Sequence, residues 1–138
     1  MSRQELRVTA HSSAGPDELF RLLSDARTWA DWAPFDESGV EDGDGVGELR
    51  RFRRGRRVTR ERVTALDPSH RLAYELVSGV PVRDYHAEVT LTPDAGGTGI
   101  EWRSTFDAPV PGTGWLVKRR LQSFIQQTAD GLARHAES

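Results

Sequence analysis

The period of the apolar pattern changes once along this chain, and that change is the strongest constraint on its fold. From Asp36 to Asp107 apolar and polar residues alternate with a period of two, which is typical of half-buried β-strands. After "APVPGTG" the period becomes 3.6, and one side of the segment is apolar. That side carries Val117, Leu121, Phe124, Ile125, Thr128 and Leu132. The pattern therefore predicts a series of strands followed by one long amphipathic helix, from Trp115 to about Ala136.

Five segments of the alternating region are predicted strands joined by short turns. They span residues 46–55, 56–67, 71–79, 82–94 and 99–108. Parallel strands would need long crossover connections between them, so short turns predict an antiparallel meander. Gly43, Gly45 and Gly47 lie in an acidic stretch before the first of these strands and indicate a loop.

A strand and two short helices are predicted before this region. "ELRVTAHS" alternates as a half-buried strand. "AGPDELFRLLSD" places Pro16 in the first turn of a helix, with the acids Asp17 and Glu18 at its positive end. A second helix, about Ala26 to Trp32, puts Trp29 and Trp32 on adjacent turns of one face. Pro34 ends it.

Composition excludes several classes of protein. With 36% hydrophobic and 29% charged residues, the chain has the composition of a globular protein. Cysteine is absent, which excludes disulfides, a cysteine nucleophile and thiolate metal sites. The first residues lack the apolar core of a signal peptide, and no run approaches a membrane span. A net charge of −2 gives no general attraction to nucleic acid. We expect a cytoplasmic protein of one domain, residues 1–138, without integral membrane association.

The order of elements predicts an α+β architecture in which a curved antiparallel sheet of about six to seven strands wraps around the long C-terminal helix. Alternation identifies the strand positions that face inward, toward this helix. They are Glu61, Val63, Leu72, Tyr74, Leu76, Tyr85, Ala87, Val89, Leu91, Ile100, Trp102, Ser104 and Phe106. Because one helix cannot fill a strongly curved sheet, we expect a cavity between the two. Of the two tryptophans, at least one should be buried and the other is a candidate wall of the cavity opening.

The chain resembles the helix-grip, START-like superfamily, also called SRPBCC, and within it the polyketide cyclase/dehydrase and lipid-transport group. The similar segments are "PDELFRLLSDARTWADWAPF", "VGELRRF", "TRERVTALDPSHRLAYEL", "GGTGIEWRSTF" and the long terminal helix, and together they cover essentially the whole chain. The resemblance implies an elongated, mostly apolar cavity for a hydrophobic or aromatic small molecule. It implies no particular reaction, because one fold hosts both binding proteins and enzymes.

Twelve residues are predicted to form the ligand-binding cavity. They are Trp29, Trp32, Arg50, Phe52, Glu61, Val63, Tyr74, Tyr85, Trp102, Ser104, Phe124 and Thr128. Arg50, which matches a position that is commonly basic in the family, is expected to pair with Glu61 across neighbouring strands. That pair is either a structural ion pair or a polar anchor for a ligand. The candidates for acid–base catalysis are Glu61, Tyr74 and Tyr85, although core packing accounts for the tyrosines equally well.

Neither a metal site nor a cofactor is predicted. His86 alternates with Tyr85 and should face solvent, and "DYHAE" lacks a second ligand-bearing segment. The run "RRFRRGRR", residues 50–57, is interpreted first as a solvated hairpin, with a membrane surface, an acidic partner or nucleic acid as alternatives.

Three functions remain open at this point. They are binding of a small hydrophobic molecule, a polyketide cyclase or dehydratase reaction assisted by Arg50, and docking of a partner through the arginine hairpin. For its own assembly, the chain is expected to be a monomer or a homodimer.

Overall fold

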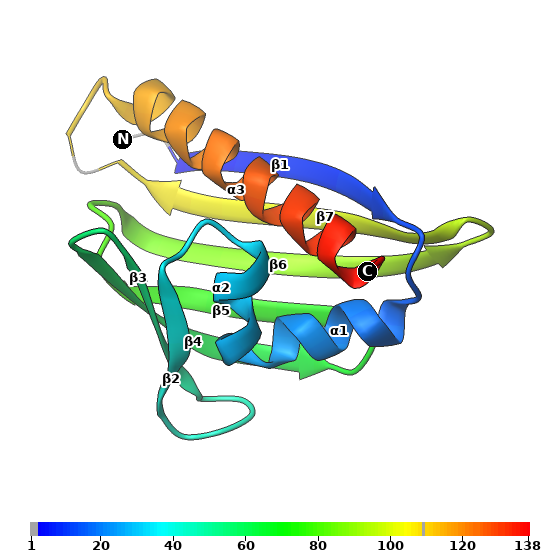
Figure 1. The fold of residues 1–138 in the computed structure, drawn as a ribbon. Helices are drawn as coiled ribbons and strands as arrows, with labels where there is room; N and C mark the ends of the chain where they lie inside the picture. The colour runs from blue at the N-terminus through cyan, green and yellow to red at the C-terminus, as the bar shows by residue number, and fades with distance from the viewer. Residues whose placement is uncertain (1–2, 109) are drawn as a thin grey trace.

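The computed structural model describes residues 3–108 and 110–138, which form one curved sheet, three short helical segments and one long helix (Figure 1). The strands are β1 (Arg3–Ser12), β2 (Glu37–Asp42), β3 (Leu49–Arg54), β4 (Arg57–Asp67), β5 (Arg71–Ser78), β6 (Arg83–Asp94) and β7 (Gly97–Asp107). The helices are α1 (Pro16–Ser24), α2 (Trp29–Trp32) and α3 (Gly114–Ala136), with a 3-10 turn, η1 (Ala26–Thr28), between α1 and α2.

All neighbouring strands of the sheet are antiparallel, in the order β1-β7-β6-β5-β4-β3-β2. The predicted antiparallel meander and helix-grip architecture are therefore confirmed. The first strand, β1, forms one edge of the sheet and pairs with the last strand, β7, with Val8 opposite Trp102. Strand β2 forms the opposite edge of the sheet and was not predicted from the sequence. Of its residues only Ser38 and Gly39 are half-buried and the others are exposed, so apolar and polar residues hardly alternate there. The acidic stretch that follows β2 is a loop, as predicted.

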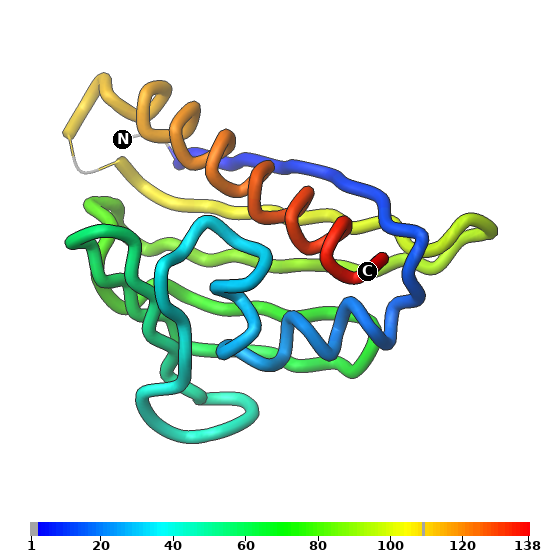
Figure 2. Tube along the Cα trace, viewed as in Figure 1, coloured from blue at the N-terminus to red at the C-terminus, as the bar shows by residue number. Residues whose placement is uncertain are grey.

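The long helix α3 crosses the concave side of the sheet and runs alongside β1 (Figures 1 and 2). The Ser12 hydroxyl at the end of β1 donates a hydrogen bond to the Ala133 carbonyl of α3 at 2.8 Å. Helix α2 also meets α3, at Gly131: a Cβ atom on this residue would lie 1.9 Å from the Trp32 carbonyl oxygen. Glycine inside a helix is unfavourable by about 1 kcal/mol, which indicates either close packing or a kink. At Gly131 the backbone of α2, the helix that carries Trp29 and Trp32, packs closely against the long helix.

The core lies between the sheet and the helices. Of the thirteen strand positions predicted to face inward, eleven are buried, and Glu61 and Leu76 are half-buried. These two residues lie near the end of the sheet where α3 begins, and there the space between helix and sheet is not filled by side chains. None of the helices in the described part of the chain combines the length and the hydropathy that a membrane-spanning helix needs.

Candidate functional site

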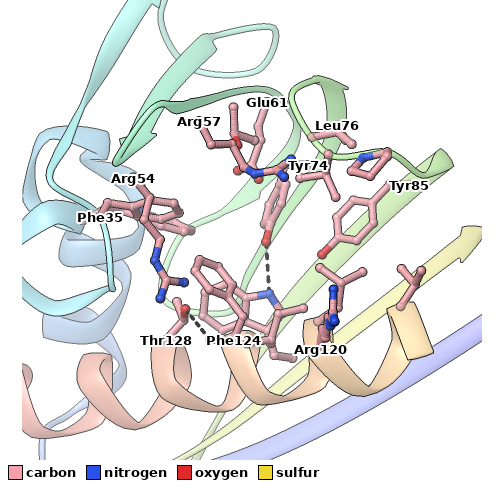
Figure 3. A pocket seen from close by; sticks show the side chains of 18 residues that line it. Phe35, Arg54, Arg57, Glu61, Tyr74, Leu76, Tyr85, Arg120, Phe124 and Thr128 are labelled. Carbon is pink, nitrogen blue, oxygen red and sulfur yellow. Dashed lines mark hydrogen bonds between the residues drawn. The ribbon is translucent and has the colours of Figure 1, made fainter. Parts of the chain in front are cut away.

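A cavity of about 550 Å³ lies between the sheet and α3, with α2 at one side (Figure 3). This volume is within the range of small-molecule sites, roughly 300–1,000 Å³. Strands β4, β5, β6 and β7 supply one wall, and the apolar side of α3 supplies the other. The lining is mostly apolar, and Glu61 is the acidic residue in it. Its size and polarity suit a largely apolar molecule rather than an ion or a sugar.

Trp29 joins the aromatic side chains at the base of the cavity. Its ring centroid lies 5.2 Å from that of Phe52, 5.8 Å from that of Trp102 and 6.3 Å from that of Tyr74. Its indole Nε1 donates to the Leu23 carbonyl at 3.1 Å, which fixes the ring relative to α1. Trp32 is also buried, 4.7 Å from Trp29, but it does not face the cavity. Trp29 is thus a rigid wall whose polar group is already satisfied.

Glu61 faces this apolar space from β4 (Figure 3). Among the described residues its carboxyl group has no hydrogen-bond or ion-pair partner. Burial disfavours the carboxylate and raises the pKa of Glu61 from 4.5 to about 8, and the nearby positive charge of Arg50 only partly opposes that increase. Glu61 is therefore mostly protonated at neutral pH, and its carboxyl can donate a hydrogen bond into the cavity.

The two tyrosines reach the cavity beside Glu61 and both hydroxyls are engaged. The Tyr85 hydroxyl lies 3.0 Å from the Ser104 hydroxyl, and Trp102 Nε1 donates to the Tyr74 hydroxyl at 3.2 Å. Burial raises the pKa of both tyrosines above the ordinary value of 10. They are neutral throughout the physiological range and act as polar hydrogen-bonding groups, not as phenolates.

The predicted ion pair between Arg50 and Glu61 is not formed. The strand register does place Arg50 opposite Glu61, but the guanidinium pairs with Glu48, at 2.7 Å between Nε and Oε2. Its other nitrogens donate to the carbonyls of Leu23 and Ser24, both at 2.9 Å. Glu48 lies two residues before Arg50 on the same strand face, and the end of α1 offers carbonyls that lack helical partners. Arg50 therefore stabilises the junction of α1 and β3, outside the cavity.

The structure brings together seven of the twelve predicted cavity residues. Those that line the cavity are Trp29, Glu61, Tyr74, Tyr85, Trp102, Phe124 and Thr128. The other five, Trp32, Arg50, Phe52, Val63 and Ser104, are buried behind the lining. Alternation identified the correct face of each strand. It did not show how far along the strand the cavity extends.

Three arginines that were not predicted to belong to the site also line the cavity. They are Arg54 at the end of β3, Arg57 at the start of β4 and Arg120 on α3 (Figure 3). The alternation along the strands could have identified two of them. Arg54 is two residues from Phe52, and Arg57 is four residues from Glu61, so each shares the inward face of its strand. Arg120 is three residues after Val117 and four before Phe124, which places it on the apolar side of the helix.

No group of three or more histidine, cysteine or acidic side chains suited to a metal ion occurs among the described residues. His86 is exposed, as predicted, and its Nε2 lies 2.9 Å from a carboxylate oxygen of Asp84.

Comparison with known proteins agrees with this geometry. The family model described as polyketide cyclase/dehydrase and lipid transport matches residues 3–137. No curated protein matches the chain. Among solved structures, the Zhui aromatase/cyclase of Streptomyces sp. R1128 is similar with a TM-score of 0.80 and 16% identity, covering 99% of this chain and 94% of that one. A protein from Chromobacterium violaceum has a TM-score of 0.75 and 22% identity, covering 97% of each chain. The major latex-like protein 151 of Panax ginseng has a TM-score of 0.77 and 12% identity, with the same coverage.

Proposed function

The chain belongs to the polyketide cyclase/dehydrase and lipid transport family, and we propose that it binds a small hydrophobic or aromatic molecule in the cavity between its sheet and α3. The observation that carries this proposal is a cavity of about 550 Å³ with an apolar lining. Transfer of apolar ligand surface from water supplies roughly 25 cal/mol per Å². The protonated Glu61 carboxyl and the tyrosine hydroxyls offer a few polar contacts that orient the molecule.

A neutral apolar dye tests the proposal directly. N-phenyl-1-naphthylamine fluoresces strongly when it leaves water, and we expect a saturable increase with the wild-type protein. Leu121 lines the cavity from α3, so Leu121→Trp fills part of the space and should weaken dye binding at least about tenfold. Gln122 is exposed on the same helix, and Gln122→Trp is the matched control that should bind like the wild type. Absence of saturable binding, or equal binding by Leu121→Trp, would refute the proposal.

Cyclisation of a polyketide-like substrate is a second candidate, favoured by the protonated Glu61. A carboxyl group that is neutral near pH 7 can donate a proton to a ketone oxygen as negative charge develops there. Arg50 has no place in this hypothesis, because its guanidinium is engaged outside the cavity. Mass spectrometry of a poly-β-keto thioester incubated with each protein is the test. A cyclised product formed by the wild type but not by Glu61→Gln supports the candidate, and equal yields contradict it.

A further inference from the structure

The opening of the cavity is basic. Four of its lining residues are exposed, and we call these four the rim: Arg54, Arg57, Pro81 and Arg120. They come from the hairpin between β3 and β4, the loop between β5 and β6, and the first half of α3. Three positive charges thus surround the place where an apolar cavity meets solvent, and Figure 3 shows their side chains around the pocket.

The rim arginines lack the carboxylate partners that Arg51 and Arg53 of the same hairpin have. Arg51 and Arg53 pair with Glu37, at 3.8 and 3.2 Å, and Arg53 also pairs with Asp36 at 3.4 Å. Within the described part of the chain, none of the three rim arginines forms an ion pair with an acidic side chain. Within the hairpin, Arg51 and Arg53 are thus paired with acids, whereas Arg54 and Arg57 at the cavity opening are not.

Two of the rim guanidiniums are held in position by other contacts. Arg54 lies over the ring of Phe124, with its Cζ 5.4 Å from the ring centroid. Arg57 donates a hydrogen bond from Nη1 to the Gly79 carbonyl. Each still has further N–H donors, because a guanidinium carries five. The acidic residue of the lining, Glu61, is mostly protonated at neutral pH and so does not offset these charges.

We propose that Arg54, Arg57 and Arg120 bind the anionic oxygen group, a carboxylate or a phosphate, of an amphipathic ligand whose apolar body occupies the cavity. This inference rests on the proposed binding function and specifies its ligand class. Guanidinium groups bind the oxygens of carboxylates and phosphates by charge-assisted, often bidentate hydrogen bonds. The apolar body would be removed from water, while the anionic group stays at the rim, where its desolvation costs least.

A pair of dyes with the same aromatic body tests this arrangement. N-phenyl-1-naphthylamine is neutral, and 8-anilinonaphthalene-1-sulfonate adds one anionic group. We expect the wild type to bind the sulfonate at least about tenfold more tightly than the neutral dye. The triple variant Arg54→Gln, Arg57→Gln, Arg120→Gln should reduce the ratio of the two dissociation constants towards one. Sodium chloride should reduce the same ratio in the wild type, because it screens the exposed charges.

Arg119→Gln is the matched control, since Arg119 is exposed beside Arg120 and does not line the cavity. Its dye ratio should equal that of the wild type. Displacement of the sulfonate dye by decanoate, decyl phosphate and decanol then defines the anion. Stronger displacement by either anion than by decanol supports the inference, and equal displacement by all three overturns it. If the wild type binds neither dye, the proposed binding function is refuted. If it binds both dyes equally tightly, the binding function stands and only the proposal that the rim arginines bind an anionic group is refuted.

Discussion

Gly131→Ala is expected to lower the free energy of unfolding by about 3 kcal/mol, although alanine is the better helix former. In an exposed helix this exchange stabilises by about 1 kcal/mol. Here the new methyl carbon would lie 1.9 Å from the carbonyl oxygen of Trp32 and 3.1 Å from its carbonyl carbon. A backbone group cannot rotate away, so α2 and α3 must separate. Because α2 carries Trp29, the separation also disturbs the base of the cavity.

Urea unfolding of wild-type and Gly131→Ala proteins measures this effect. Gly39→Ala is the control, since a Cβ atom at Gly39 meets no atom within 4 Å and the residue lies in β2, where alanine is favoured over glycine. It should be neutral or stabilising by about 0.5 kcal/mol. A stabilising effect of Gly131→Ala would mean that the two helices do not approach as closely as the structure indicates.

The fold was predictable from the sequence because its pattern is regular and its turns are short. The change from period two to 3.6 separates sheet from helix, and the antiparallel order follows from the lengths of the connections. Strand β2 was not assigned because it lies at an edge of the sheet and buries little, so its alternation carries weak information. The contact between α2 and α3 has one indication in the sequence, Gly131. Glycine is unfavourable inside a helix, and close packing is one of the reasons for which it occurs there.

The site was predictable only in part, because alternation gives the face of a strand but not the neighbours of a side chain. Arg50 was predicted to line the cavity and to pair with Glu61, yet Glu48 and two carbonyls at the end of α1 bind its guanidinium outside the cavity. The two carbonyls belong to a segment distant in the sequence, and only the folded chain shows that it approaches Arg50. The rim arginines were not predicted for a different reason. A run of charged residues is more often a solvated surface than part of a binding site.

Glu61→Gln is expected to stabilise the protein at alkaline pH and to have little effect at acidic pH. Glutamine has the shape of the protonated carboxyl and does not ionise. In the wild type, burial raises the pKa of Glu61 to about 8 in the folded state, against an ordinary value of 4.5. Between these two values the unfolded chain releases the proton and the folded chain retains it. The stability of the wild type relative to the variant therefore falls as pH rises from about 4.5 to about 8 and is constant above that.

Each unit of difference between the folded and unfolded pKa values corresponds to about 1.36 kcal/mol. The rise from 4.5 to about 8 therefore sets an upper limit of about 5 kcal/mol for the effect on the free energy of unfolding. At pH 8.5, just above the folded-state pKa of about 8, we expect most of this limit, about 4 kcal/mol. Urea unfolding of both proteins at pH 4.5 and pH 8.5 measures it. Glu75→Gln is the control, because Glu75 follows Tyr74 on β5 and does not line the cavity. An equal difference at both pH values for Glu61→Gln would show that its carboxyl is solvated as in the unfolded chain. Glu61 would then be ionised at neutral pH, and the cavity would present a negative charge to its ligand instead of a hydrogen-bond donor.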